Sequence, residues 1–129
     1  MKVLAVQHVP HEGLGALESV LTERGADIRY LETWREDIAD IDPAEHDLAV
    51  VLGGPMGVYQ GDIFPTLDKE VVYLKQRMAQ DLPTIGFCLG SQLMASALDA
   101  NVYPGDNGTE IGWHPLSILP EGENSPVKY

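Results

Sequence analysis

Short apolar runs alternate along this chain with segments of helical spacing, and this alternation constrains the fold more than any other feature. The run at 3–6 is apolar throughout, as expected for a strand buried on both faces, and the most strand-like run is 47–52 (DLAVVL). Further strands are predicted at 27–31 and 83–87, and helices at 14–21, 66–80 and 89–98. Strands that alternate with helices predict an α/β fold, with a doubly wound, mostly parallel sheet and helices on both faces.

Weaker patterns fill the rest of the chain. Thr33 with Glu36 forms a capping-box pattern, which predicts a short helix before Pro43. Extended segments are expected at 102–103 and 111–119, whereas residues 120–126 are rich in turn formers and do not resemble the last element of a finished sheet. We therefore expect residues 1–129 to be the N-terminal portion of a single domain, with a sheet that is incomplete at its C-terminal side.

The charge of the chain argues against two classes of partner. Its 20 acidic and 8 basic residues give a net charge of −12, and neither nucleic acid nor an anionic membrane surface is expected to bind such a chain. The single cysteine cannot form an intrachain disulfide, and the apolar stretch before Gln7 is too short for a signal peptide or a membrane span. We expect a cytoplasmic protein.

Cys88 is the strongest candidate for a catalytic residue. It stands in Gly86-Phe87-Cys88-Leu89-Gly90, at the junction of a predicted strand and a predicted helix. This is the cysteine form of a nucleophile elbow, in which glycines relieve crowding where the chain reverses. The predicted helix points free N–H groups and the positive end of its dipole toward the sulfur, which favours the thiolate.

A cysteine nucleophile also needs donors for the oxyanion that its attack creates. The backbone N–H of Leu89, directly after the nucleophile, is one candidate. The turn Gly53-Gly54-Pro55 follows the DLAVVL strand and offers Gly54 as the second. Both loops follow parallel strands, so they are expected at the same edge of the sheet, where ligands bind in such folds.

The other polar residues give weaker signals. His8 follows the first strand and is a minor candidate for a residue that lines the site, whereas His46 is expected to face solvent. No cluster of Cys and His has metal-ligand spacing, and no glycine-rich phosphate-binding pattern is present. We therefore predict no metal and no cofactor.

These motifs together resemble the class I glutamine amidotransferase family. The matching residues are Gly-Phe-Cys-Leu-Gly-Ser-Gln at 86–92, preceded by Gly-Gly-Pro at 53–55. Within the family, the chain is most similar to stand-alone proteins that resemble the amidotransferase domain of GMP synthase. Four further segments share this resemblance, at 7–10, 59–65, 102–105 and 110–113.

The resemblance implies a flavodoxin-like fold and a glutaminase reaction. Cys88 would attack the side-chain amide of glutamine, release ammonia and leave a glutamyl thioester for water to hydrolyse. Gly54 and Leu89 would hold the oxyanion, and Gln92 and Gly57 would bind the substrate. In complete members of the family, ammonia passes to an acceptor on a synthetase domain or subunit, so the implied partners are glutamine and a synthetase.

The resemblance also shows what is missing. The family's general base is a histidine, oriented by a glutamate in a His-Pro-Glu type motif well downstream of the nucleophile. His114-Pro115-Leu116 has leucine in the third position, and its context matches a different family strand. We therefore expect this chain to hold the nucleophile without its usual histidine and glutamate partners.

Two other interpretations stay open at the level of sequence. One is a γ-glutamyl peptidase or another cysteine hydrolase on a similar fold. The other is a non-catalytic assembly module that retains the elbow, in which unpaired strand edges would drive self-association.

Overall fold

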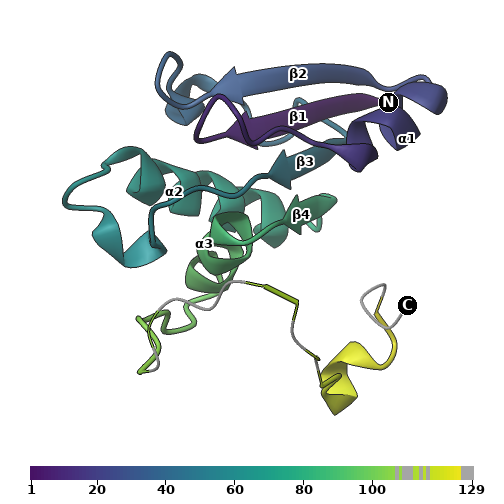
Figure 1. Cartoon of the computed structure of the whole chain (residues 1–129). Coiled ribbons are helices and arrows are strands. Elements are labelled where there is room, and N and C mark those ends of the chain that lie inside the picture. Colours follow the sequence, from purple (N-terminus) through teal and green to yellow (C-terminus); the bar gives the residue numbers. More distant parts are fainter. Residues whose placement is uncertain (107, 109–111, 114, 116, 126–129) are drawn as a thin grey trace.

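A four-stranded parallel sheet forms the centre of the computed structural model, which describes residues 1–106, 108, 112–113, 115 and 117–125. The strand order is β2-β1-β3-β4, and every neighbouring pair runs parallel. All carboxyl ends of the strands therefore lie at one edge of the sheet, on the left in Figure 1. The strands are β1 (Lys2–Gln7), β2 (Asp27–Glu32), β3 (Leu48–Val51) and β4 (Thr84–Gly86), and the α-helices are α1 (Ala16–Glu23), α2 (Thr66–Ala79) and α3 (Leu89–Ala97).

The side chains of β1 alternate between two hydrophobic cores on opposite faces of the sheet. Leu4 and Val6 pack into a core built with α2, α3 and the 3₁₀ helix η1 (Ile38–Asp40). Val3 and Ala5 pack into a second core with Leu21 of α1. Helices thus cover both faces, and the predicted doubly wound α/β fold is confirmed.

A fully buried arginine ties together the loops that precede β3 and β4. The guanidinium of Arg77, on α2, donates to the carbonyls of Pro43, His46 and Pro83 and to the hydroxyl of Thr84. These bonds hold the 43–46 loop in place, and His46 at its end is buried, with only 4% of the residue exposed. The prediction that His46 faces solvent was wrong, because the loop is fixed by an arginine distant in sequence.

The short helix predicted from Thr33 and Glu36 was also wrong. The N–H groups of Arg35 and Glu36 both donate to the Glu32 carbonyl, which makes a turn at the end of β2. The helix in this region is η1, which starts after Asp37, and the Asp37 carboxylate accepts a 3.0 Å bond from the N–H of Ala39. A carboxylate two residues before an N–H group caps it well, so the chain turns first and becomes helical later.

The extended segments predicted near the C-terminus are not strands where the structure describes them. Residues 102–103 are irregular, and Tyr103 is largely exposed. Of the predicted segment 111–119, residues 111, 114 and 116 lie outside the described residues, and the described ones form no strand. A short 3₁₀ helix, η3 (Pro120–Gly122), follows and lies apart from the α/β body (Figure 1). Extended segments become strands only when a sheet edge accepts them, and no bond from these residues to β4 is present in the described structure.

Candidate active site

Cys88 lies on the sharp turn between β4 and α3, with φ at 51°. This left-handed conformation is uncommon for a residue with a side chain and is typical of strained turns at functional sites. Two glycines allow it. A Cβ at Gly86 would lie 2.5 Å from the Gly90 carbonyl, and a Cβ at Gly90 would lie 2.1 Å from the carbonyl oxygen of Val51. The predicted strand–turn–helix arrangement is present, and close backbone contacts require both glycines.

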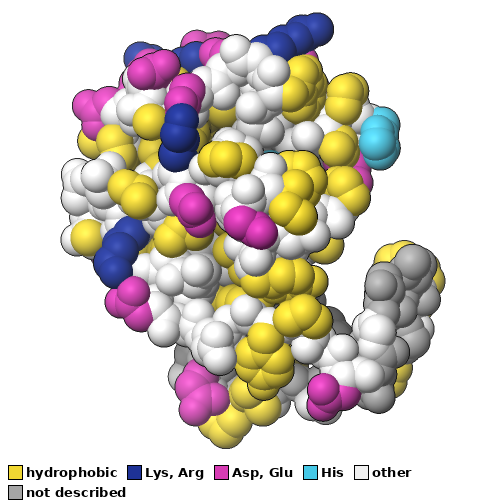
Figure 2. All heavy atoms as spheres, turned by 90° about the vertical axis from the view of Figure 1, so that its left-hand side faces the viewer, with side chains coloured by type: hydrophobic (Ala, Val, Ile, Leu, Met, Phe, Trp, Pro, Cys, Tyr) yellow, Lys and Arg dark blue, Asp and Glu magenta, His cyan; other side chains and the backbone are white. Residues whose placement is uncertain are grey.

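The Cys88 residue is exposed and borders a cavity at the carboxyl edge of the sheet. The cavity has a volume of about 470 Å³, within the usual range for small-molecule sites. The loop between β1 and α1 forms one wall, and Leu52, Gly53 and Phe87 complete the lining beside the cysteine. Figure 2 faces this edge of the molecule, and hydrophobic side chains gather across its middle and lower part. The nucleophile candidate is therefore accessible to a small substrate.

The Gly53–Gly54 turn lies directly against the elbow. A Cβ at Gly53 would be 3.6 Å from the Cβ of Cys88, and a Cβ at Gly54 would be 3.1 Å from Cδ2 of Leu89. The same position at Gly53 would be 2.7 Å from a carboxylate oxygen of Glu12, which also lines the cavity. The two loops that sequence analysis assigned to one edge of the sheet are thus in contact.

Four backbone N–H groups at this point donate no hydrogen bond within the described part of the chain. They belong to Gly53, Gly54, Cys88 itself and Leu89, the first residue of α3. The first bonds at this helix end are donated by Gly90 to Phe87, at 2.8 Å, and by Ser91 to Cys88, at 3.0 Å. The N–H groups of Gly54 and Leu89 are therefore free to receive an acceptor such as an oxyanion, and their assignment to that role stays a prediction.

Gln92 and Gly57 lie near each other. The Oε1 atom of Gln92 accepts a 3.3 Å bond from the N–H of Val58, in the 3₁₀ helix η2 (Val58–Gln60) that Gly57 precedes. The ring of Tyr59 covers Gly57, where a Cβ would be 2.4 Å from Cζ of that ring. Among the described residues, neither Gln92 nor Gly57 lines the cavity beside Cys88. Their predicted role in substrate binding stays a prediction.

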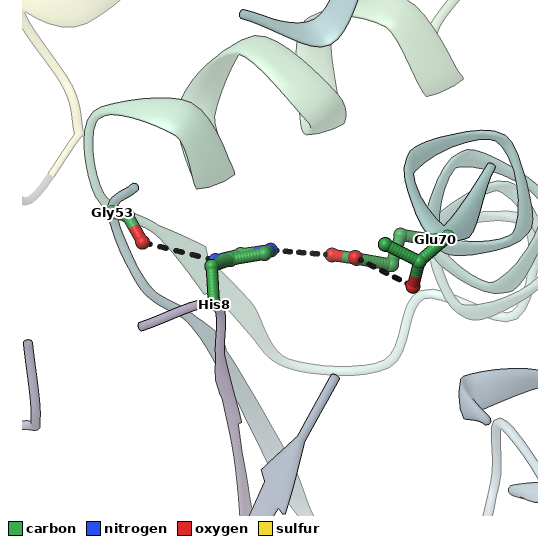
Figure 3. A network of polar contacts seen from close by, with 4 residues as sticks. His8, Gly53 and Glu70 are labelled. Atoms are coloured by element: carbon green, nitrogen blue, oxygen red, sulfur yellow. Dashed lines mark hydrogen bonds and ion pairs between the residues drawn. The ribbon is translucent and has the colours of Figure 1, made fainter. Parts of the chain in front are cut away.

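His8 occupies a buried position behind the Gly53–Gly54 turn. Its Nδ1 lies 3.0 Å from the carbonyl oxygen of Gly53, and its Nε2 lies 2.8 Å from Oε2 of Glu70 on α2 (Figure 3). Burial lowers the pKa of His8. The hydrogen bond and negative charge of Glu70, with smaller contributions from the Gly53 carbonyl and Glu12, together raise this pKa by more than burial lowers it. The net pKa lies above its ordinary value of 6.5.

Sequence reasoning did not find Glu70 or Glu12. Glu70 carried a usable signal, because Leu67, Glu70 and Leu74 share the helical spacing of one face and a carboxylate there is buried with its neighbours. Glu12 carried none, since only the path of the β1–α1 loop brings it to Gly53. Its loop is held by Gln7, whose Nε2 donates to the Glu12 carbonyl at 3.2 Å.

Several other features can be stated only for the residues that the structure describes. No histidine ring is hydrogen-bonded to Cys88 among them, and His114 lies outside them. They include no group of three or more His, Cys, Asp or Glu side chains placed to hold a metal ion. None of their helices is long and apolar enough to span a bilayer.

Comparison with known proteins agrees with this geometry. Residues 15–125 match the model of the family Glutamine amidotransferase class-I. The chain belongs to the class I glutamine amidotransferase family, as its elbow and Gly-Gly-Pro turn predicted.

Particular relatives define the match more closely. The chain is 30% identical to the glutamine amidotransferase-like protein YfeJ of Salmonella typhimurium, over 98% of this chain and 54% of that protein. It is 43% identical over 70 residues to the glutamine-hydrolyzing GMP synthase of Carboxydothermus hydrogenoformans, a match that covers 54% of this chain and 12% of that enzyme. The crystal structure of a glutamine amidotransferase from Thermotoga maritima superimposes with a TM-score of 0.82 at 36% identity, over 97% of this chain and 54% of that one. The chain thus spans about half the length of the two proteins that it matches over nearly all its residues.

Proposed function

We propose that this chain supplies the nucleophile of a glutaminase site, with Cys88 as the attacking residue. The observation that carries the proposal is the contact between two loops: Cys88, at φ 51°, borders the cavity, and the Gly53–Gly54 turn lies beside it. The Cys88 thiolate would add to the amide carbon of glutamine, and the carbonyl electron pair would move to oxygen. Collapse would break the C–N bond, ammonia would leave after gaining a proton, and water would hydrolyse the glutamyl thioester to glutamate.

Backbone groups would stabilise the oxyanion in this reaction. The N–H groups of Gly54 and Leu89 are without acceptors in the described structure and belong to the two loops in contact. Donors fixed before the reaction starts stabilise developing charge more than water does. Gln92, on α3 one helical turn after Cys88, and Gly57, which directly precedes η2, would contribute to glutamine binding.

The rest of the proposed reaction depends on groups beyond those described around Cys88. We propose that residues 1–129 correspond to the N-terminal portion of one amidotransferase domain, because they span 54% of two relatives. A histidine and glutamate would then complete the site, and a synthetase would supply the ammonia acceptor. The relative named GMP synthase [glutamine-hydrolyzing] supports such a partner. A cytoplasmic location fits the lone cysteine, which cannot form an intrachain disulfide.

Alkylation of Cys88 tests the proposal directly. Iodoacetamide at neutral pH is expected to modify Cys88 faster than a free thiol, because Cys88 is exposed and directly precedes the free N–H groups at the start of α3. Mass spectrometry of the modified peptide gives the rate, and Cys88→Ser provides the blank. A rate no greater than that of free cysteine would contradict the proposed nucleophile.

Ammonia release from glutamine gives a second measurement on the same protein. We expect residues 1–129 alone to release little ammonia, because no described histidine is bonded to Cys88. Rapid turnover would show that a residue of this chain acts as the base, and His114 would be the first to replace.

A further inference from the structure

A buried polar network lies directly behind the proposed oxyanion turn. Figure 3 shows the ring of His8 as a bridge between the Gly53 carbonyl and the Glu70 carboxylate. The side chains of His8 and Glu70 are both 0% exposed. The other oxygen of Glu70 lies 3.4 Å from the hydroxyl of Thr66, one turn earlier on α2. The network therefore connects α2 to the turn through a single imidazole.

The partners of His8 determine where its protons lie. A carbonyl oxygen can only accept a hydrogen bond, and so can an ionised carboxylate. Nδ1 of His8 therefore donates to the Gly53 carbonyl, and an ionised Glu70 would accept from Nε2 as well, so that the ring pairs with Glu70 as an imidazolium. A buried ion pair is costly to desolvate, and apolar residues of similar volume often stabilise a core as well. Its place behind this particular turn thus calls for a reason beyond stability.

The geometry of a peptide bond supplies that reason. The peptide between Gly53 and Gly54 is planar and trans, so the carbonyl of Gly53 and the N–H of Gly54 point in opposite directions. A bond that holds the carbonyl toward His8 therefore holds the N–H away from His8. Glycine on both sides gives this peptide unusual freedom to rotate, and the turn at Gly54 packs on Leu89 at the start of α3.

We infer that His8, held by Glu70, is a positioning residue that fixes the Gly53–Gly54 peptide with the Gly54 N–H turned toward the oxyanion beside Cys88. This inference rests on the proposed function, since an oxyanion forms there only if Cys88 is the nucleophile. His8 itself touches no reacting atom and acts only through the turn.

Two reactions of Cys88 separate positioning from reactivity. Iodoacetamide alkylates the thiolate by displacing iodide and passes through no oxyanion. With p-nitrophenyl acetate, the thiolate adds to the ester carbonyl, the electron pair moves to oxygen, and p-nitrophenolate leaves as an acetyl thioester forms. Only the second reaction uses the oxyanion donors, so the ratio of the two rate constants reports on them.

The test uses His8→Asn, Glu70→Gln and a matched control. Removing one oxyanion donor slows acyl transfer by about 100-fold. His8→Asn would keep the Gly54 N–H but hold it less firmly, so we expect the ratio of the p-nitrophenyl acetate rate constant to the iodoacetamide rate constant to fall by about tenfold. Glu70→Gln keeps a hydrogen-bond acceptor without its charge and should lower the ratio less. Leu74→Ala removes a fully buried side chain from the core on the same helix and should reduce stability without changing the ratio.

The outcomes distinguish the two proposals. If the ratio in folded His8→Asn and Glu70→Gln equals that of the wild type, the positioning role is wrong while the nucleophile assignment stands. If wild-type Cys88 reacts with neither reagent faster than a free thiol does, the proposed function fails and the positioning role fails with it. If circular dichroism shows that His8→Asn is unfolded, the comparison of Glu70→Gln with Leu74→Ala decides the matter.

Discussion

Each glycine two positions from Cys88 is required by a different backbone contact. Gly86 faces the backbone of Gly90 and Ser91, whereas Gly90 faces the carbonyl of Val51 at the end of β3. The glycines therefore let α3 begin directly over the sheet, which places the first turn of the helix at its carboxyl edge. The spacing of glycines around the cysteine was visible in the sequence, but the partners that exclude a Cβ were not.

Gly90→Ala tests this contact, with Gly105→Ala as its control. A Cβ at Gly90 would lie 2.1 Å from the Val51 oxygen, whereas one at Gly105 would meet nothing within 4 Å. Alanine is the better helix former by about 1 kcal/mol, yet overpacking costs about 1–3 kcal/mol and more when backbone must move. We expect Gly90→Ala to lower the free energy of urea unfolding by about 3 kcal/mol, and Gly105→Ala to change it by less than about 0.5 kcal/mol. Equal stabilities would show that α3 shifts freely on the sheet.

At the scale of elements, α2 links both ends of the sheet. Near its start, Glu70 reaches His8 behind the proposed site at the carboxyl edge. Near its end, Arg77 holds the loops before β3 and β4 at the opposite edge. The apolar spacing of 66–80 predicted this helix well, but two of its charged residues are fully buried. Spacing alone does not distinguish a buried charge with partners from an exposed one.

Arg77→Met tests the second link, with Lys75→Met as the matched change on the exposed side of α2. Loss of the guanidinium would leave the carbonyls of Pro43 and His46 without a donor, whereas that of Pro83 still accepts from the Ala49 N–H, and a buried group left unpaired costs about 1–3 kcal/mol. We expect a loss of about 3 kcal/mol in unfolding free energy for Arg77→Met. Lys75 makes an exposed ion pair with Asp99, and such pairs contribute less than about 1 kcal/mol. A similar loss for both variants would contradict the role of Arg77 in holding the loops before β3 and β4.

For the whole molecule, two buried histidines make stability depend on pH in opposite directions. The pKa of His8 is raised by Glu70 and, more weakly, by Gly53 and Glu12, despite burial that lowers it. The pKa of His46 is lowered, chiefly by burial, although the charge of Glu45 raises it in part. His8 therefore stabilises the fold fully below its unfolded pKa near 6.5, and this contribution is lost as pH rises through its folded pKa. His46 behaves conversely, and its contribution is lost as pH falls below 6.5.

Urea unfolding at several pH values, with reductant to protect Cys88, checks these signs. The difference in unfolding free energy between wild type and His8→Asn should shrink as pH rises from 6 to 9. The difference between wild type and His46→Asn should shrink as pH falls from 7.5 to 5.5. A His8 difference that grows with pH would mean that the buried ring is neutral in the folded state.

The sequence by itself determined the class of fold, the family and the elbow. Apolar runs and helical spacing are local properties, and glycines around a cysteine constrain the backbone wherever it lies. Tertiary structure alone decided the partners of His8 and Arg77, the buried position of His46 and the approach of Glu12 to Gly53. The His8–Glu70 and Arg77–His46 contacts join residues 62 and 31 positions apart, and hydrogen bonds between such distant residues leave no periodic pattern in a sequence. Cys88 could therefore be found from its neighbours in the chain, whereas the His8–Glu70 pair behind its proposed oxyanion turn became visible only when α2 packed against the sheet.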